Sequence, residues 1–121
     1  MRREELYLRD IIEAVDAVKQ FLEGIEKNDF IKNDLLRSAV LQKFGILGEA
    51  SARLSPELKS RYPQTSWKRI IGLRNIAAHA YFTIDFEIVW LTVANRLEPL
   101  RKEVIAILQI EYPDFELPDK D

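Results

Sequence analysis

The residues of this chain that could carry out chemistry lie between Arg74 and Tyr81. This short run also contains Asn75 and the only histidine of the chain, His79. Histidine can both donate and accept a proton near neutral pH, and the arginine fork matches phosphate oxygens. Cleavage of a phosphodiester needs a base, an acid and positive charge beside the phosphate. The run therefore has the residue types of a phosphodiester-cleaving site.

The sequence predicts that these side chains share one helix over residues 66–80, capped by Ser66. The segment contains no proline, and its apolar residues recur at helical spacing, at Trp67, Ile70, Leu73 and Ala77. On such a helix Arg74 and His79 lie about 140° apart around the axis and about 7.5 Å apart along it. Asn75 lies four residues before His79, so these two side chains share a stripe.

One chain supplies a single histidine, which links a nuclease interpretation to dimerisation. A twofold dimer that placed two of these helices side by side would supply two histidines and two arginines. From the residues alone a structural interpretation is equally open. His79 could be a hydrogen-bonded, partly buried residue, Arg74 could pair with a carboxylate, and Tyr81 could be an amphipathic residue at a helix end.

Length and composition indicate one globular domain. The chain has 121 residues, of which 47% are hydrophobic and 31% charged. The absence of cysteine excludes disulfides, thiolate nucleophiles and Cys-based metal sites. A single histidine also argues against zinc, and we expect no metal and no other cofactor. No apolar run reaches membrane-spanning length and the N-terminus lacks a signal-peptide core, so we expect a cytoplasmic protein without a membrane partner.

Basic residues gather before the motif although the net charge of the chain is −2. Residues 53–74 contain one acidic residue, Glu57, and six basic residues: Arg53, Lys59, Arg61, Lys68, Arg69 and Arg74. Local positive charge there would attract phosphates. The candidates for RNA contacts are Lys59, Arg61, Lys68 and Arg69. It is equally open that they are ordinary solvated charges.

Apolar periodicity predicts an antiparallel bundle of four main helices plus a short one. The expected helices cover residues 4–26, 33–54, 66–80 and 85–110, with a short helix between Ser55–Pro56 and Tyr62–Pro63. The segment Asn28–Asp29 is predicted to be a loop. Pro99 should kink the last helix rather than divide it, because the apolar pattern keeps its phase. Residues 1–110 form the predicted bundle, and residues 111–121 form an acidic, proline-containing tail.

The second main helix carries small residues where another helix could approach closely. Gly45 and Gly48 each cost up to about 1 kcal/mol relative to Ala inside a helix. Together with Ala52 they predict a close helix crossing. Arg37 and Glu49 on this helix are surface charges that could also reach the motif helix and orient its residues.

The run Arg74-Asn75-x-x-x-His79-x-Tyr81 resembles the R-x4-H-x-Y motif of the HepT-like branch of the HEPN superfamily. Further stretches resemble the family pattern in the same order: Ile46–Ala50, Leu54–Glu57, Tyr62–Pro63, Trp67–Leu73, Tyr81–Asp85 and Val89–Trp90. The resemblance covers nearly the whole chain except the acidic tail, and no motif position departs from the pattern.

The resemblance implies an all-α, HEPN-like homodimer that acts as a toxin in a type VII-like toxin-antitoxin pair. It implies a metal-independent endoribonuclease in which Arg74 and His79 are catalytic at the dimer interface. Asn75 and Glu49 would support them. A cognate minimal nucleotidyltransferase antitoxin would neutralise the toxin by transferring AMP to Tyr81.

Two alternatives remain open beside the enzyme. The same dimer could bind nucleotide or RNA, or serve as the partner of a nucleotidyltransferase, without cleaving anything. A helical adaptor would instead have a structural Arg–His pair, with His79 buried from solvent.

Overall fold

The computed structural model describes residues 2–83 and 85–117, with the side chains of residues 80–83 outside the description. The elements in chain order are α1 (Glu4–Phe21), α2 (Lys27–Lys32), α3 (Asp34–Arg53), α4 (Pro56–Arg61), α5 (Trp67–Thr83), α6 (Phe86–Thr92), the π-helical turn η1 (Val93–Leu97) and α7 (Glu98–Glu111). These ranges contain helices and no strand, which confirms the predicted all-α class.

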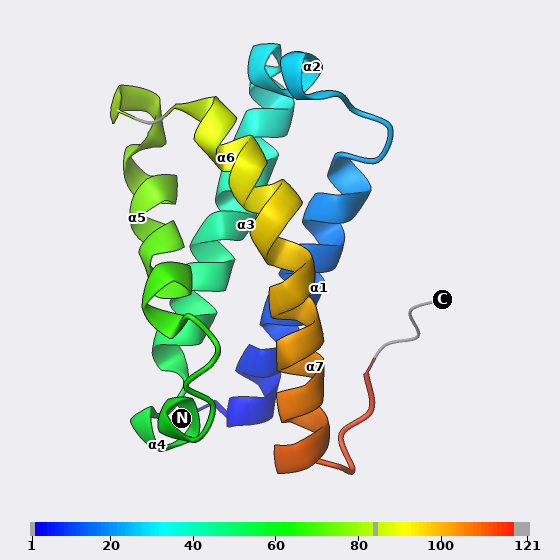
Figure 1. The fold of residues 1–121 in the computed structure, drawn as a ribbon, viewed down its shortest axis with the longest axis vertical. Helices are drawn as coiled ribbons and strands as arrows, with labels where there is room; N and C mark the ends of the chain where they lie inside the picture. Colours follow the sequence, from blue (N-terminus) through cyan, green and yellow to red (C-terminus); the bar gives the residue numbers. More distant parts are fainter. Residues whose placement is uncertain (1, 84, 118–121) are drawn as a thin grey trace.

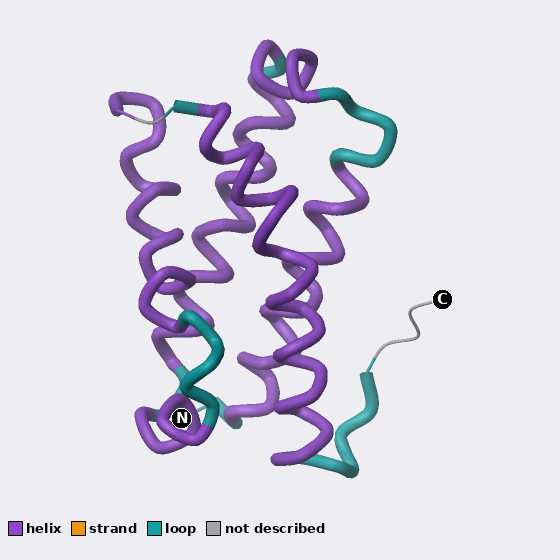
Figure 2. The backbone as a smooth tube through the Cα atoms, viewed as in Figure 1, coloured by secondary structure: helices purple, strands orange, loops and turns teal. Residues whose placement is uncertain are grey.

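Four columns of helix run along the long axis of the molecule (Figure 1). They are α1, α3, α5 and the continuous α6–η1–α7 column, and consecutive columns run in opposite directions. Short loops connect them, and the small helices α2 and α4 lie at opposite ends (Figure 2). The antiparallel bundle predicted from the sequence is therefore confirmed.

Local sequence signals start the helices where they were predicted. The Asn33 side chain accepts a hydrogen bond from the backbone N–H of Leu36 at 3.0 Å and caps α3. Ser55 caps α4 in the same way, and Pro56 follows it at the first helical position. Asp85 accepts from the backbone N–H of Glu87 at 2.9 Å and starts α6. The motif helix α5 begins directly after Ser66, as expected.

The predicted loop at Asn28–Asp29 was wrong, because these residues belong to α2. The first helix ends earlier than predicted, at Phe21, and Gly24 makes the turn with a φ of 75°. Phe30 explains the extra helix: its side chain is fully buried and lies 5.6 Å from the Trp90 ring, centroid to centroid. A six-residue helix held by one buried aromatic shows no periodicity in the sequence.

The last column continues helically through Pro99, as predicted, but it adjusts through a π-helical turn. Proline has no N–H to donate and its ring crowds the preceding turn. The π-helical turn η1 lies immediately before it, and the backbone at Thr92, Val93 and Leu97 remains right-handed helical. The adjustment is thus a local change of helical pitch.

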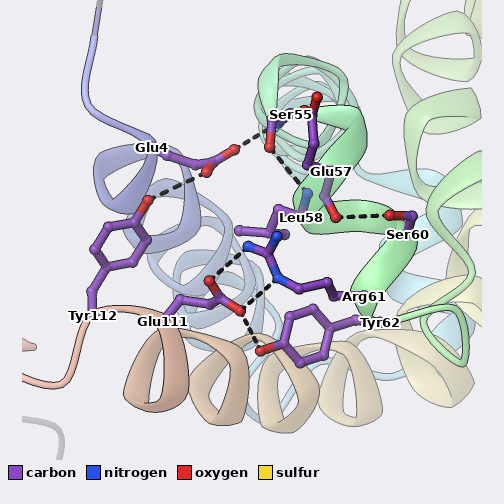
Figure 3. Close-up of polar contacts among 9 residues, drawn as sticks. All are labelled: Glu4, Ser55, Glu57, Leu58, Ser60, Arg61, Tyr62, Glu111 and Tyr112. Carbon is purple, nitrogen blue, oxygen red and sulfur yellow. Dashed lines mark hydrogen bonds and ion pairs between the residues drawn. The ribbon is translucent and has the colours of Figure 1, made fainter.

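A polar clasp joins both ends of the described chain to α4 (Figure 3). Glu4 accepts hydrogen bonds from the backbone N–H of Ser55 at 2.6 Å and from the Tyr112 hydroxyl at 3.3 Å. Glu111 accepts two bonds from Arg61, at 3.0 and 2.7 Å, and one from the Tyr62 hydroxyl at 2.6 Å. Three apolar or aromatic residues after α7 are half-buried against the core: Tyr112, Phe115 and Leu117. The predicted division at residue 110 stays a prediction.

Glu111→Gln should make stability less dependent on pH. The hydrogen bonds from Arg61 and then Tyr62 lower the pKa of Glu111. A lowered pKa in the folded state stabilises the fold above the unfolded-state pKa of about 4.3 and loses that contribution as pH falls. In urea denaturation, the free energy of unfolding of wild type should exceed that of Glu111→Gln at pH 7. The difference should shrink at pH 3.

Glu116→Gln provides the control for this clasp, since Glu116 is an exposed carboxylate of the same segment. Its free energy of unfolding should follow wild type at both pH values. A deficit of Glu111→Gln that was equal at pH 7 and pH 3 would contradict the role of the ionised carboxylate.

Candidate active site on α5

The motif helix α5 crosses α3 at very close range. A Cβ placed on Gly48 would lie 2.6 Å from the backbone nitrogen of Arg74 and 2.9 Å from the carbonyl oxygen of Ile71. Only glycine fits there, so the predicted close crossing is confirmed at Gly48. Gly45 is different, because its Cβ would lie 3.7 Å from that of Ala77, in ordinary contact.

The crossing brings Arg74 beside Glu49, the next residue of α3. Arg74 Nη1 donates to Glu49 Oε1 at 3.1 Å, and Arg53 Nε donates to Glu49 Oε2 at 3.0 Å. The hydrogen bonds from Arg53 and then Arg74 lower the pKa of Glu49. Glu49 therefore contacts the Arg74 guanidinium through one oxygen and Arg53 through the other. The side chains of Arg74 and Glu49 are 44% and 49% exposed, so this ion pair is weak and can be exchanged for a stronger anion.

Lys59 reaches the same region from α4. Its ammonium donates to the backbone carbonyl of Ser51 at 3.0 Å. Burial lowers the pKa of Lys59, and the nearby charge of Arg74 lowers it further. One of the four basic candidates thus shares the neighbourhood of the motif arginine.

The other basic candidates lie elsewhere, so the four do not form one cluster. Arg61 is held by Glu111 at the α4 end of the bundle (Figure 3), which neutralises its charge. Lys68 and Arg69 are exposed in the first turn of α5. Arg37 lies against α2 and α6 rather than beside Arg74: it donates to the carbonyl of Ile31 at 2.9 Å and stacks over the Phe86 ring.

His79 and Asn75 are both exposed on α5. This disagrees with the adaptor alternative, which required a buried His79. Arg74, five residues before His79, is exposed as well, so these three motif residues are all open to solvent. Tyr81 belongs to α5, but its side chain lies outside the described residues, and its assigned role is untested by the geometry.

A shallow groove of small side chains borders Arg74 between α3 and α5. Its lining residues are Ser38, Leu41, Gln42, Gly45, Arg74, Ala77 and Ala78. The small side chains leave room for another backbone to approach the motif helix. Across residues 2–83 and 85–117, no three His, Asp or Glu side chains gather in a way that could hold a metal ion. Within the same ranges, no helix is long and apolar enough to cross a membrane.

Comparison with known proteins identifies the family. The model of the "Ribonuclease HepT-like" family matches residues 11–107. The chain is 37% identical over 103 residues to "Putative RNase MJ1380" of Methanocaldococcus jannaschii, covering 85% of this chain and 94% of that protein. It is 32% identical over 111 residues to "Putative RNase TTE0752" of Caldanaerobacter subterraneus subsp. tengcongensis, covering 92% and 99%.

A third relative is "Probable ribonuclease HepT" of Thermococcus cleftensis, 31% identical over 100 residues, covering 83% of this chain and 91% of that protein. No solved structure matches the chain. The fold, the motif on α5 and these matches define a ribonuclease of the HEPN type. The chain belongs to the HepT-like ribonuclease family.

Gly48→Ala should destabilise the protein through the crossing, whereas Gly45→Ala should not. A methyl group at residue 48 would press on the α5 backbone, and overpacking of this kind costs about 1–3 kcal/mol. That exceeds the gain of up to about 1 kcal/mol from replacing glycine in a helix. Urea denaturation should show a lower midpoint for Gly48→Ala. Gly45→Ala should match or exceed wild type, and equal midpoints for the two variants would disprove the packing argument.

Proposed function

We propose that this protein is a metal-independent endoribonuclease that works as a homodimer. The observation that carries the proposal is the exposed motif surface of α5, where Arg74 borders a groove of small side chains. A second copy of α5 could approach that groove closely and bring two Arg74 and two His79 side chains around one phosphate. Family membership supports ribonuclease chemistry at this surface.

In the proposed reaction, one His79 takes the proton from the ribose 2′-hydroxyl, whose oxygen attacks the adjacent phosphorus. The bond from phosphorus to the 5′-oxygen breaks, and that oxygen receives a proton from the His79 of the partner. The products are a 2′,3′-cyclic phosphate and a 5′-hydroxyl. Arg74 donates to the phosphate oxygens as their charge grows, while Glu49 and Asn75 orient Arg74 and His79.

Regulation by AMP transfer is the finer part of the proposal. Tyr81 lies seven residues after Arg74 on the same helix, which places the two about 20° apart around the axis. The Tyr81 hydroxyl would attack the α-phosphate of ATP, held by a minimal nucleotidyltransferase, and release pyrophosphate. A bulky anionic group at that position would obstruct the proposed site between the two copies of α5 and would repel RNA. According to this proposal, the unmodified protein is the toxin of a toxin–antitoxin pair, and the nucleotidyltransferase is its antitoxin.

His79→Ala should abolish RNA cleavage in the presence of EDTA without unfolding the bundle. Loss of a general acid–base group typically lowers the rate about 10²–10⁴-fold. Purified wild type and His79→Ala should be compared on a single-stranded RNA, with product ends analysed for cyclic phosphate. Circular dichroism should show equal helicity, since His79 is exposed. Cleavage by His79→Ala at the wild-type rate would refute its role.

The same assay separates the enzyme from a binding module. A folded dimer that bound RNA but did not cleave it would favour the non-catalytic alternative. Size-exclusion chromatography with light scattering tests the dimer directly, and an active monomer would refute the shared site.

Tyr81→Phe should block AMP transfer and leave a toxin that can no longer be neutralised. Wild type incubated with the partner nucleotidyltransferase and ATP should gain the mass of one AMP and lose cleavage activity. Tyr81→Phe should gain no mass and keep its activity. Tyr62→Phe is the matched control, because its hydroxyl is held by Glu111. Modification of Tyr81→Phe would show that another residue is the acceptor.

A further inference from the structure

A second groove lies between α5 and the η1–α7 column, on a different side of α5 from α3. We call it the α5–η1 groove; its volume is about 510 Å³, within the usual range for small-ligand sites. Its apolar floor includes Leu73, Leu97 and Leu100, which are buried core residues. Arg69 of α5 and Arg96 of η1 both line it, one from each side.

Two features of the backbone are found in the walls of this groove. Gly72 lies in its α5 wall, and a Cβ placed there would meet nothing within 4 Å. Unlike Gly48, therefore, Gly72 is not required by helix packing, although it costs up to about 1 kcal/mol relative to Ala. The opposite wall contains Asn95, Arg96 and Leu97 of the π-helical turn. Such turns redirect side chains and are frequent at functional sites.

The groove leads along α5 toward His79. Arg69, Gly72, Ile76 and His79 follow one another at intervals of three and four residues, so they form a single stripe. The stripe is about 15 Å long. Ile76 lines the groove one turn before His79. A chain of nucleotides bound at His79 could therefore continue into the groove.

The lining has the chemistry of a nucleotide site. Within the described residues neither Arg69 nor Arg96 forms an ion pair, so both forks are available to a phosphate. Glu103 is the one acid in the lining, which leaves a net positive charge. The amide side chains of Gln64 and Asn95 can donate to and accept from the edge of a base, while the apolar floor can accept its face.

We propose that the α5–η1 groove is an RNA subsite that holds a nucleotide flanking the phosphate to be cleaved. This inference rests on the proposed ribonuclease function for its role, but RNA binding in the groove can be measured without cleavage. Arg69 and Arg96 bind the backbone of the flanking nucleotide, and Gln64 and Asn95 contact its base.

The test uses the full chain and a fluorescent RNA whose 2′-hydroxyls are methylated, so that the attacking group is absent. Arg96→Gln should weaken binding about tenfold, as expected for one charged hydrogen-bonded contact. It should also reduce the slope of log affinity against log salt by about 0.7, the value for one phosphate of a single strand. Gly72→Leu, which fills the groove, should weaken binding similarly, and Gly72→Ala should do so less.

Lys102→Gln is the matched control, because it removes one positive charge from an exposed residue of α7 outside the groove. Its affinity and salt slope should equal those of wild type. Circular dichroism should confirm that Gly72→Leu is folded, and Arg96→Gln gives a second variant that removes no packing contact with the core.

The outcomes separate the groove from the nuclease. If wild type binds RNA and both Arg96→Gln and Gly72→Leu bind equally well, the groove proposal is overturned while the cleavage site at His79 stands. If these variants bind weakly but wild type never cleaves RNA, the groove stands and the nuclease proposal fails. If wild type does not bind the methylated RNA, the groove proposal is overturned, and the cleavage assay with His79→Ala decides the nuclease proposal by itself.

Discussion

The close approach of α3 and α5 at Gly48 is the constraint on which the site depends. The two backbones meet where no side chain can stand between them, so the position of Arg74 along and around α3 is fixed. That fixed position lets Glu49, the neighbour of Gly48, reach the guanidinium and places Lys59 in its electrostatic field. A bulkier crossing would move the motif arginine away from both. A residue without a side chain thus organises the charged ones.

The ion pair between Arg74 and Glu49 is more exposed than the pair of Arg101 and Asp16, which joins two columns of the bundle. Arg101 and Asp16 form an ion pair at 2.6 Å between α7 and α1, and their side chains are only 17% and 24% exposed. The pair of Arg74 and Glu49 is longer and about half exposed. Solvent screens it, so a phosphate that offers two oxygens to the arginine fork can compete with the carboxylate. The difference in exposure between these two ion pairs suits their places: Arg101 and Asp16 hold two helices together, whereas Arg74 can exchange Glu49 for a phosphate.

Most of the fold could be predicted because its signals are local. Short stretches of sequence were enough to predict where helices start, at the caps Asn33, Ser55 and Asp85. The same holds for the close helix crossing at Gly48. The motif run could be placed on a helix for the same reason. The helix α2 could not be foreseen, since it depends on Phe30 meeting residues of α6 far along the chain. Likewise, the sequence predicted that Arg61 was available to RNA, because its partner Glu111 lies far along the chain and is brought beside it only by the fold.

The polar clasp has a practical consequence for how the molecule can be held. Glu4, near one end of the described chain, and Glu111, near the other, both fasten to the α4 end of the bundle. The motif helix runs away from that end, and its last turns lie at the opposite pole (Figure 1). A bead, a surface or a fused domain attached near Glu4 would therefore sit at the α4 end of the bundle, away from the last turns of the motif helix.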